Sequence, residues 1–214
     1  MPVITEPEAS DGLTFLELQE EFRARGFDDF AAGDSRMKRW INWAYREVVD
    51  YAPWPFLEGE VEDTAPVEIE NLGHVLSVAD GTLGSPLSPI DRRTVVQNYD
   101  PGLTSKGTPS LWYRESEDTI AVYPKNTTNT IQVRFIANPP KLVEDTDKVW
   151  LPYDYCELIV DGSVIRGLKH RSAWEEVATA RLEWERSLKQ MRHALLKVNY
   201  DSPKVVRRTG TDYL

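Results

Sequence analysis

Three histidines and a single cysteine are the side chains of this sequence that most often perform catalysis or bind metals. His74, His170 and His193 show no spacing typical of metal ligands, such as a His-Glu-x-x-His pattern. Cys156 stands alone, which excludes an internal disulfide and a zinc site built from cysteines. A lone cysteine beside apolar residues usually packs as a small hydrophobic side chain. We therefore expect no metal site and no catalytic residue at these positions.

Carboxylates and glycines offer two further possibilities, a cation site and a phosphate-binding loop. Glu144, Asp145 and Asp147 lack the ladder of ligands and the glycine of a calcium loop, so we expect a solvated acidic linker. Gly81 and Gly84 are not followed by the Lys-Ser or Lys-Thr pair of a P-loop, and the chain has no Gly-x-Ser-x-Gly elbow. The sequence thus predicts a protein that is not an enzyme and takes no cofactor.

The composition is that of a folded, acidic protein. The chain has 214 residues, of which 41% are hydrophobic, with 7 tryptophans and a formal net charge of −10. This charge argues against general nucleic-acid binding, which needs Lys and Arg side chains to neutralise phosphates. No stretch approaches the ~20 apolar residues of a membrane span, and the acidic start lacks the features of a signal peptide. We therefore expect a protein used in a cytoplasm or in particles assembled there.

Two amphipathic helices are predicted in the first quarter of the chain. The first begins at a capping box on Thr14 and ends at Gly26. The second is capped by Asp34 or Ser35, carries apolar residues at spacings of three and four, and ends before Pro53. Both patterns indicate helices with one buried face.

Two more helices are predicted after position 150. One resumes at about residue 153, and the other starts at a second capping box in the segment 172–175. Ordering about 25 residues of this last helix costs more free energy than burying its apolar stripe returns, so it must pack on the other helices. One bundle made of both helix pairs is therefore the economical arrangement. The stripe consists of Ala173, Val177, Ala180, Trp184, Leu188, Met191 and Leu195.

The middle of the chain changes to frequent Gly, Pro, Thr and Asn, with runs of period two. Strands are predicted at 75–78, 111–115, 119–123 and 130–137, with a short helix at 90–99. The last three strands are separated by hairpin-sized connections and predict an antiparallel meander. In 130–137 apolar and polar residues alternate, which indicates one buried and one solvated face.

The expected fold class is α+β: a helical bundle with an inserted antiparallel β domain and an extended C-terminal tail. The predicted boundaries are a flexible arm at 1–13, a helical bundle domain at 14–58 and 150–198, an inserted β domain with its linker at 59–149, and the tail at 199–214.

Two tryptophans fall off the apolar stripes of their helices. Trp43 and Trp174 are predicted to pack on the inserted domain or on a neighbouring subunit, since Trp is enriched at interfaces. The mildly basic, partly apolar tail is either solvated or suited to a partner.

Several blocks in order resemble the head-to-tail adaptor (connector) proteins of tailed bacteriophages over roughly residues 14–196. The first block is RWINWAYREVV at 39–49, followed by PWPFL at 53–57. The second comprises GTPSLWY at 107–113, IAVYP at 120–124 and IQVRF at 131–135. The third is LPYDYCELIV at 151–160, which leads into a helix.

This resemblance implies a structural virion protein in the neck, assembled in the host cytoplasm as a ring that matches the twelvefold portal. The implied partners are the portal protein, neighbouring copies in the ring, and a stopper, tail or other neck protein. Genomic DNA would pass through the lumen without specific binding. In relatives the C-terminal segment reaches into the portal, which makes the following tail residues candidates for portal binding: Tyr200, Val205, Val206, Arg207, Arg208, Tyr213 and Leu214.

Two alternatives stay open at this point. One is a stopper or tail-completion protein of the same particle, or a non-viral interaction protein. The other is an enzyme that uses scattered carboxylates, which no spacing in the sequence favours.

Overall fold

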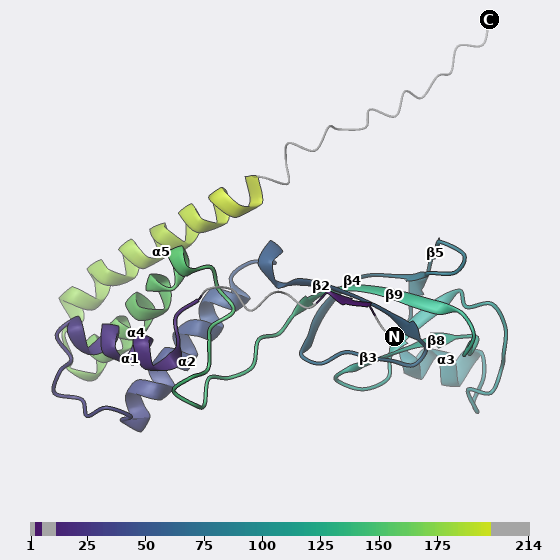
Figure 1. Cartoon of the computed structure of the whole chain (residues 1–214), viewed down its shortest axis with the longest axis horizontal. Helices are drawn as coiled ribbons and strands as arrows, with labels where there is room; N and C mark the ends of the chain where they lie inside the picture. The colour runs from purple at the N-terminus through teal and green to yellow at the C-terminus, as the bar shows by residue number, and fades with distance from the viewer. Residues whose placement is uncertain (1–2, 6–11, 198–214) are drawn as a thin grey trace, which may run out of the picture.

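The computed structural model describes residues 3–5 and 12–197. Helices gather in one half of an elongated molecule and two sheets in the other, and the chain crosses between the halves at the end of α2 and before α4 (Figure 1). This arrangement confirms the predicted α+β class. The predicted tail at 199–214 lies outside the described residues.

The first two helices form where the capping signals predict them. α1 spans Phe15–Ala24, with the Thr14 side chain and Glu17 forming the reciprocal capping box. α2 spans Ser35–Asp50, and the carboxylate of its N-cap, Asp34, accepts from the backbone N–H of Arg36. Both caps satisfy backbone donors that a helix start leaves without partners.

The second helix pair continues the bundle. α4 spans Glu157–His170 after the 3₁₀ turn Tyr153–Tyr155, and α5 spans Trp174–Lys197. The capping box predicted at 172–175 is wrong, because Ser172 adopts a left-handed φ of 59° and the first α5 bond runs from Val177 N–H to the carbonyl of Ala173. An N-cap needs extended backbone, so Ser172 ends the preceding helix turn instead.

One hydrophobic core joins all four helices. Phe15, Phe22 and Met37 are fully buried in it, and Leu188 and Met191 of α5 are 2% exposed. Gly162 of α4 lets α2 and α5 approach, since a Cβ there would lie 2.9 Å from Cβ of Ala44. The prediction that α5 packs on the other helices through its stripe is therefore confirmed.

The other half of the molecule consists of two sheets and a short helix. The first sheet has the order β1-β2-β9-β4-β5, and the second has the order β3-β8-β7-β6. All strand pairs are antiparallel except β6 with β7. The strands are β1 Val3–Thr5, β2 Glu58–Thr64, β3 Val67–Glu68, β4 Leu72–Asp80, β5 Ser85–Pro86, β6 Ser88–Pro89, β7 Leu111–Arg114, β8 Thr119–Tyr123 and β9 Thr130–Ala137, with α3 at Arg92–Asn98 and the 3₁₀ turn Pro55–Leu57 before β2.

These elements form three layers. Ile131 and Val133 of β9 face Ile120 and Val122 of β8 in a core between the sheets. On the other side of the second sheet, α3 packs Val95 against β7 and β8. β9 therefore alternates buried and solvated residues, as its sequence predicts, whereas β8 is covered on both faces.

The predicted meander is wrong in one pairing. β7 pairs with β8 as expected, but β9 lies between β2 and β4 in the other sheet. The strand β2 escaped prediction because Glu58, Glu60 and Glu62 dominate its composition. Gly59 and Val61 are its buried positions.

Candidate functional site

Cys156 and His170, two of the side chains that could perform catalysis or bind a metal, pack in or against the helical core. Cys156 is fully buried, its thiol lies 3.8 Å from the carbonyl oxygen of Leu151, and burial raises its pKa. His170 ends α4 and packs on the rings of Phe30 and Trp40. A thiol held protonated in a core is not a nucleophile. Among the described residues, no group of His, Cys, Asp and Glu side chains is placed to hold a metal ion.

His74 and His193 lie apart from each other, on β4 and α5, and both are exposed. Gly81 and Gly84 belong to a tight turn after β4, where the Asp80 carboxylate accepts from the N–H groups of Thr82 and Leu83 at 3.0 Å. The two glycines therefore belong to a turn that the Asp80 carboxylate holds in place.

The acidic linker fastens α1 and α2 to the returning chain. Asp145 accepts hydrogen bonds from Lys38 at 2.8 Å and Gln19 at 3.1 Å, and these bonds hold its pKa below the usual value. Asp147 accepts from the backbone N–H groups of Val143 and Glu144. Both carboxylates are thus engaged in holding the linker.

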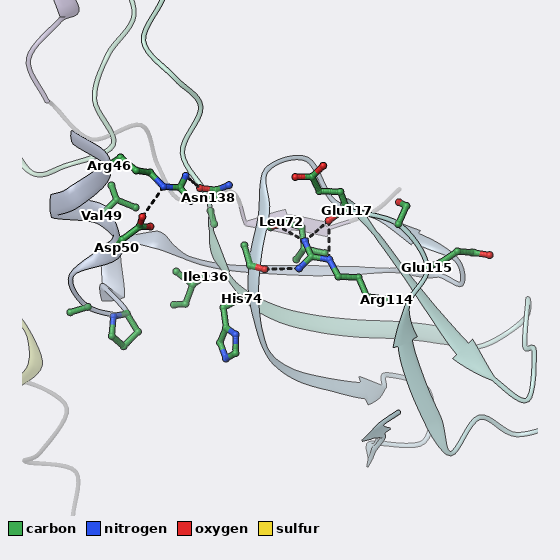
Figure 2. A pocket seen from close by; sticks show the side chains of 15 residues that line it. Arg46, Val49, Asp50, Leu72, His74, Arg114, Glu115, Glu117, Ile136 and Asn138 are labelled. Atoms are coloured by element: carbon green, nitrogen blue, oxygen red, sulfur yellow. Dashed lines mark hydrogen bonds and ion pairs between the residues drawn. The ribbon is translucent and has the colours of Figure 1, made fainter. Parts of the chain in front are cut away.

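An open cleft lies between the helical half and the sheets (Figure 2). It measures about 750 Å³ and is lined by the end of α2, β4, the β7–β8 turn and the end of β9. Arg114 donates to the carbonyls of Leu72 at 2.7 Å, Gly73 at 3.1 Å and Glu117 at 3.0 Å, while Arg46 reaches Asn138. Backbone carbonyls thus bind the guanidinium of Arg114 and tie β7 to β4, while the contact from Arg46 to Asn138 ties α2 to the chain that follows β9.

A second cavity, the Trp43 groove, lies where α2 meets the linker that follows β9. It has a volume of about 320 Å³. Trp43 is 46% exposed, and the guanidinium of Arg166 lies 4.9 Å and that of Arg39 6.0 Å from its ring centroid. The lining side chains described by the structure include three cations and no carboxylate. They are Arg39, Asn42, Trp43, Tyr45, Arg46, Val49, Pro139, Pro140 and Lys141.

Partly buried polar contacts fix the linker that forms one wall of the Trp43 groove. The Asn42 side chain donates to the carbonyl of Leu142 at 3.0 Å and accepts from its N–H at 2.9 Å. The Tyr45 hydroxyl accepts from the N–H of Trp150 at 2.9 Å, and burial raises the Tyr45 pKa. An aromatic side chain flanked by cations on a braced groove suits the anchor of a protein interface.

The other predicted interface tryptophan lies at the start of α5. Trp174 is 65% exposed, and Leu182, two turns further along the helix, is 70% exposed. Glu175 and Glu176 make this first turn acidic. The Trp174 turn and the Trp43 groove are thus separate exposed surfaces of opposite charge. The predicted portal-binding residues of the tail, from Tyr200 to Leu214, lie outside the described residues.

The chain matches the family model described as SU10 adaptor protein over residues 13–208. The chain belongs to this family. It is a family of phage head-to-tail adaptors, so the resemblance seen in the sequence is confirmed, and the protein is a phage structural component of the virion. No curated protein matches the sequence. None of the helices within 12–197 is long and apolar enough to cross a membrane.

The sequence of this adaptor predicts that Trp43 and Trp174 lie off the buried faces of their helices, but it does not predict what surrounds either side chain. Pro139, Pro140 and Lys141 follow Trp43 by about a hundred positions in the sequence, and only the return of the chain along α2 brings them together. In the sequence, the pair Pro139-Pro140 indicates a linker after the strand 130–137, but nothing indicates what this linker packs on.

Proposed function

We propose that this adaptor forms a ring beneath the portal, connects the capsid to the tail, and leaves a channel for DNA. The observation that carries the proposal is the family match, which spans both halves of the molecule and part of the tail. Closed rings with more than two members use heterologous contacts, in which two different surfaces of each copy meet. In this role the protein acts by assembly and performs no catalysis.

The Trp43 groove and the Trp174 turn are the two surfaces that we assign to this contact. One exposes an indole among the cations Arg39 and Lys141, and the other exposes an indole beside Glu175. Charge complementarity of this kind favours the contact between different surfaces over contacts between like surfaces.

The tail is the part that we assign to the portal. Its basic and apolar residues are suited to a segment that orders on its partner. The proposed contact residues are Tyr200, Val205, Val206, Arg207, Arg208, Tyr213 and Leu214.

The net charge of −10 per copy bears on DNA passage. A ring of such subunits surrounds DNA with like charge, and tight binding would need phosphate neutralisation. Genomic DNA is therefore expected to slide through the lumen without specific binding. A mainly basic lumen in an assembled ring would contradict this part of the proposal.

A pull-down against the portal from the same genome tests the function. Full-length protein is expected to bind, and a chain ending at Val198 is expected not to bind. The variant Arg207→Gln/Arg208→Gln should weaken binding, whereas the matched variant Arg186→Gln/Arg192→Gln, on the exposed surface of α5, should bind normally. If neither full-length nor truncated protein binds and the protein joins tail components instead, it is a stopper or tail-completion protein.

Cysteine trapping on the portal tests the ring contact. A mixture of Trp43→Cys and Trp174→Cys chains should form mixed disulfide dimers, and neither variant alone should do so. Tyr99→Cys, in the β half and 59% exposed, serves as the control partner for Trp43→Cys. Dimers of a single variant would indicate a contact between like surfaces and would contradict the assignment.

A further inference from the structure

The β half carries a groove that the proposed ring contact does not use. This acidic groove has a volume of about 690 Å³. Its apolar side chains include Val61, Phe135 and the half-buried Trp150, and Trp150 packs on both large cores of the molecule. The full lining comprises Val61, Glu68, Ile69, Glu70, Asn71, Ser116, Asp118, Thr119, Phe135, Ala137 and Trp150.

The rim of this groove concentrates negative charge. Glu68, Glu70 and Asp118 are exposed, and no Lys or Arg belongs to the lining described by the structure. Their carboxylates form no ion pair with any cation within 12–197, while other acids such as Glu47 and Asp29 are paired with arginines. Three unpaired carboxylates above an apolar floor repel one another and favour a cationic occupant.

The chain itself contains a segment of matching chemistry. Residues 202–211, Ser-Pro-Lys-Val-Val-Arg-Arg-Thr-Gly-Thr, carry three cations and no carboxylate, in a protein with a net charge of −10. Val205 and Val206 supply apolar side chains for the floor, and Lys204, Arg207 and Arg208 supply charge for the rim.

The tail begins where α5 ends. α5 ends at Lys197, and this end of the helix lies nearer to the β half than its start does (Figure 1). An extended chain covers at most ~3.5 Å per residue, so the stretch from Lys197 to Lys204, where the cationic segment begins, spans up to roughly 25 Å.

We propose that the acidic groove is the docking site for the tail segment Lys204–Arg208 while the adaptor is free of the portal. The groove and the portal then compete for the same residues, so that binding to the portal releases the tail from the groove. This second step rests on the proposed function of the tail, whereas docking in the groove does not. A tail held on the body is shielded from other anionic surfaces until the portal displaces it.

Protection of the tail from trypsin in the full-length protein, without the portal, tests the docking. The groove variant Glu68→Gln/Glu70→Gln/Asp118→Asn should be cleaved after Lys204, Arg207 and Arg208 about tenfold faster than the parent, since it loses the charge that holds the segment. The matched variant Glu20→Gln/Glu21→Gln/Glu183→Gln removes the same charge from exposed helix positions and should be cleaved at the parental rate. Equal cleavage of the parent and the groove variant would overturn the proposal.

A binding measurement gives a second readout. A labelled peptide of residues 199–214 should bind a chain ending at Val198, which retains α1 to α5 and all nine strands of the described structure. Its Kd should rise about tenfold in the groove variant and also on raising the salt from about 0.05 M to 0.5 M, because salt screens these charges. A Kd that is identical for the parent and groove variants overturns the proposal. Portal binding by full-length protein is measured separately, so failure of the groove and failure of the portal contact are distinguishable.

Discussion

The helical half and the β half bury their apolar side chains in different ways. The helices share one core whose members come from both ends of the chain, such as Phe22 of α1 and Leu188 of α5. The β half is built mostly from one continuous stretch, and its layers enclose two smaller cores on the two faces of the second sheet. The helical core therefore closes only when distant segments meet, whereas the pairings of the sheets form within about eighty residues.

The two cores meet at few places, of which Trp150 is the clearest. The halves are therefore joined by polar contacts and by few apolar ones, chiefly Trp150 and Ile136 of β9. A change in one core should accordingly weaken its own half first, and amide hydrogen exchange reports each half separately.

Trp54→Ala should have the largest effect. Trp54 is fully buried in the helical core, and its indole N–H donates to the carbonyl of Val48 at 2.8 Å. Truncation should lower the free energy of unfolding by about 3–5 kcal/mol, measured by denaturant titration. The control is Trp43→Ala, an exposed position on the neighbouring helix, which should cost less than about 1 kcal/mol. Similar losses for the two variants would contradict the assigned burial.

Ile131→Ala should weaken the β half selectively. Ile131 is fully buried between the sheets, so its truncation should cost about 2–5 kcal/mol. Amides of β2, β4 and β9 should exchange faster, and amides of α2 and α4 should keep their parental rates. Equal acceleration in the helices would mean that the molecule unfolds as one unit.

Tyr45→Phe tests the brace between the halves. It removes the hydroxyl that accepts from the N–H of Trp150 and leaves the apolar ring in place. The expected loss is about 1 kcal/mol, and exchange should rise at residues 149–151 without a general effect. Unchanged exchange at Trp150 would show that this bond does not hold the linker.

Acid should weaken the helical half before the β half. Hydrogen bonds from Thr14, Arg36 and Lys38 hold the pKa values of Glu17, Asp34 and Asp145, respectively, below their usual range. In the β half, backbone N–H groups within residues 102–105 lower the pKa of one carboxylate, that of Asp100. A lowered folded pKa contributes stability above the unfolded pKa, and this stability is lost as the pH falls through the folded pKa. Helical ellipticity should therefore decline between about pH 5 and pH 2, before exchange in β9 rises. An earlier loss of the sheets would contradict this order.

In the helical half, short stretches of sequence are sufficient to predict where the helices begin and which faces they bury. The caps at Thr14 and Asp34, and the buried faces of α2 and α5, follow from patterns that span four to eight residues. The failed N-cap at Ser172 shows the limit, because the preceding turn imposed a left-handed backbone that no side-chain pattern indicated.

Pairing between distant strands was the less predictable part. β9 was correctly bounded, yet its neighbours β2 and β4 could not be chosen from its own alternation. β2 was hidden because its three glutamates lie on the solvated side of the sheet, although Gly59 and Val61 alternate with them. Similarly, the Trp43 groove and the acidic groove combine residues that are far apart in the sequence, so neither groove could be predicted from the sequence alone.

The pairing of β2 with β9 has a consequence for how this adaptor can vary. Glu58 at the start of β2 lies opposite Ile136 near the end of β9, so the chain leaves the helices and returns to them through neighbouring strands. A segment whose two ends lie side by side behaves as a cassette: it can be shortened, lengthened or exchanged without altering the distance that the helices must bridge. Natural diversification of the particle's neck can thus proceed in the cassette while the helical frame stays constant.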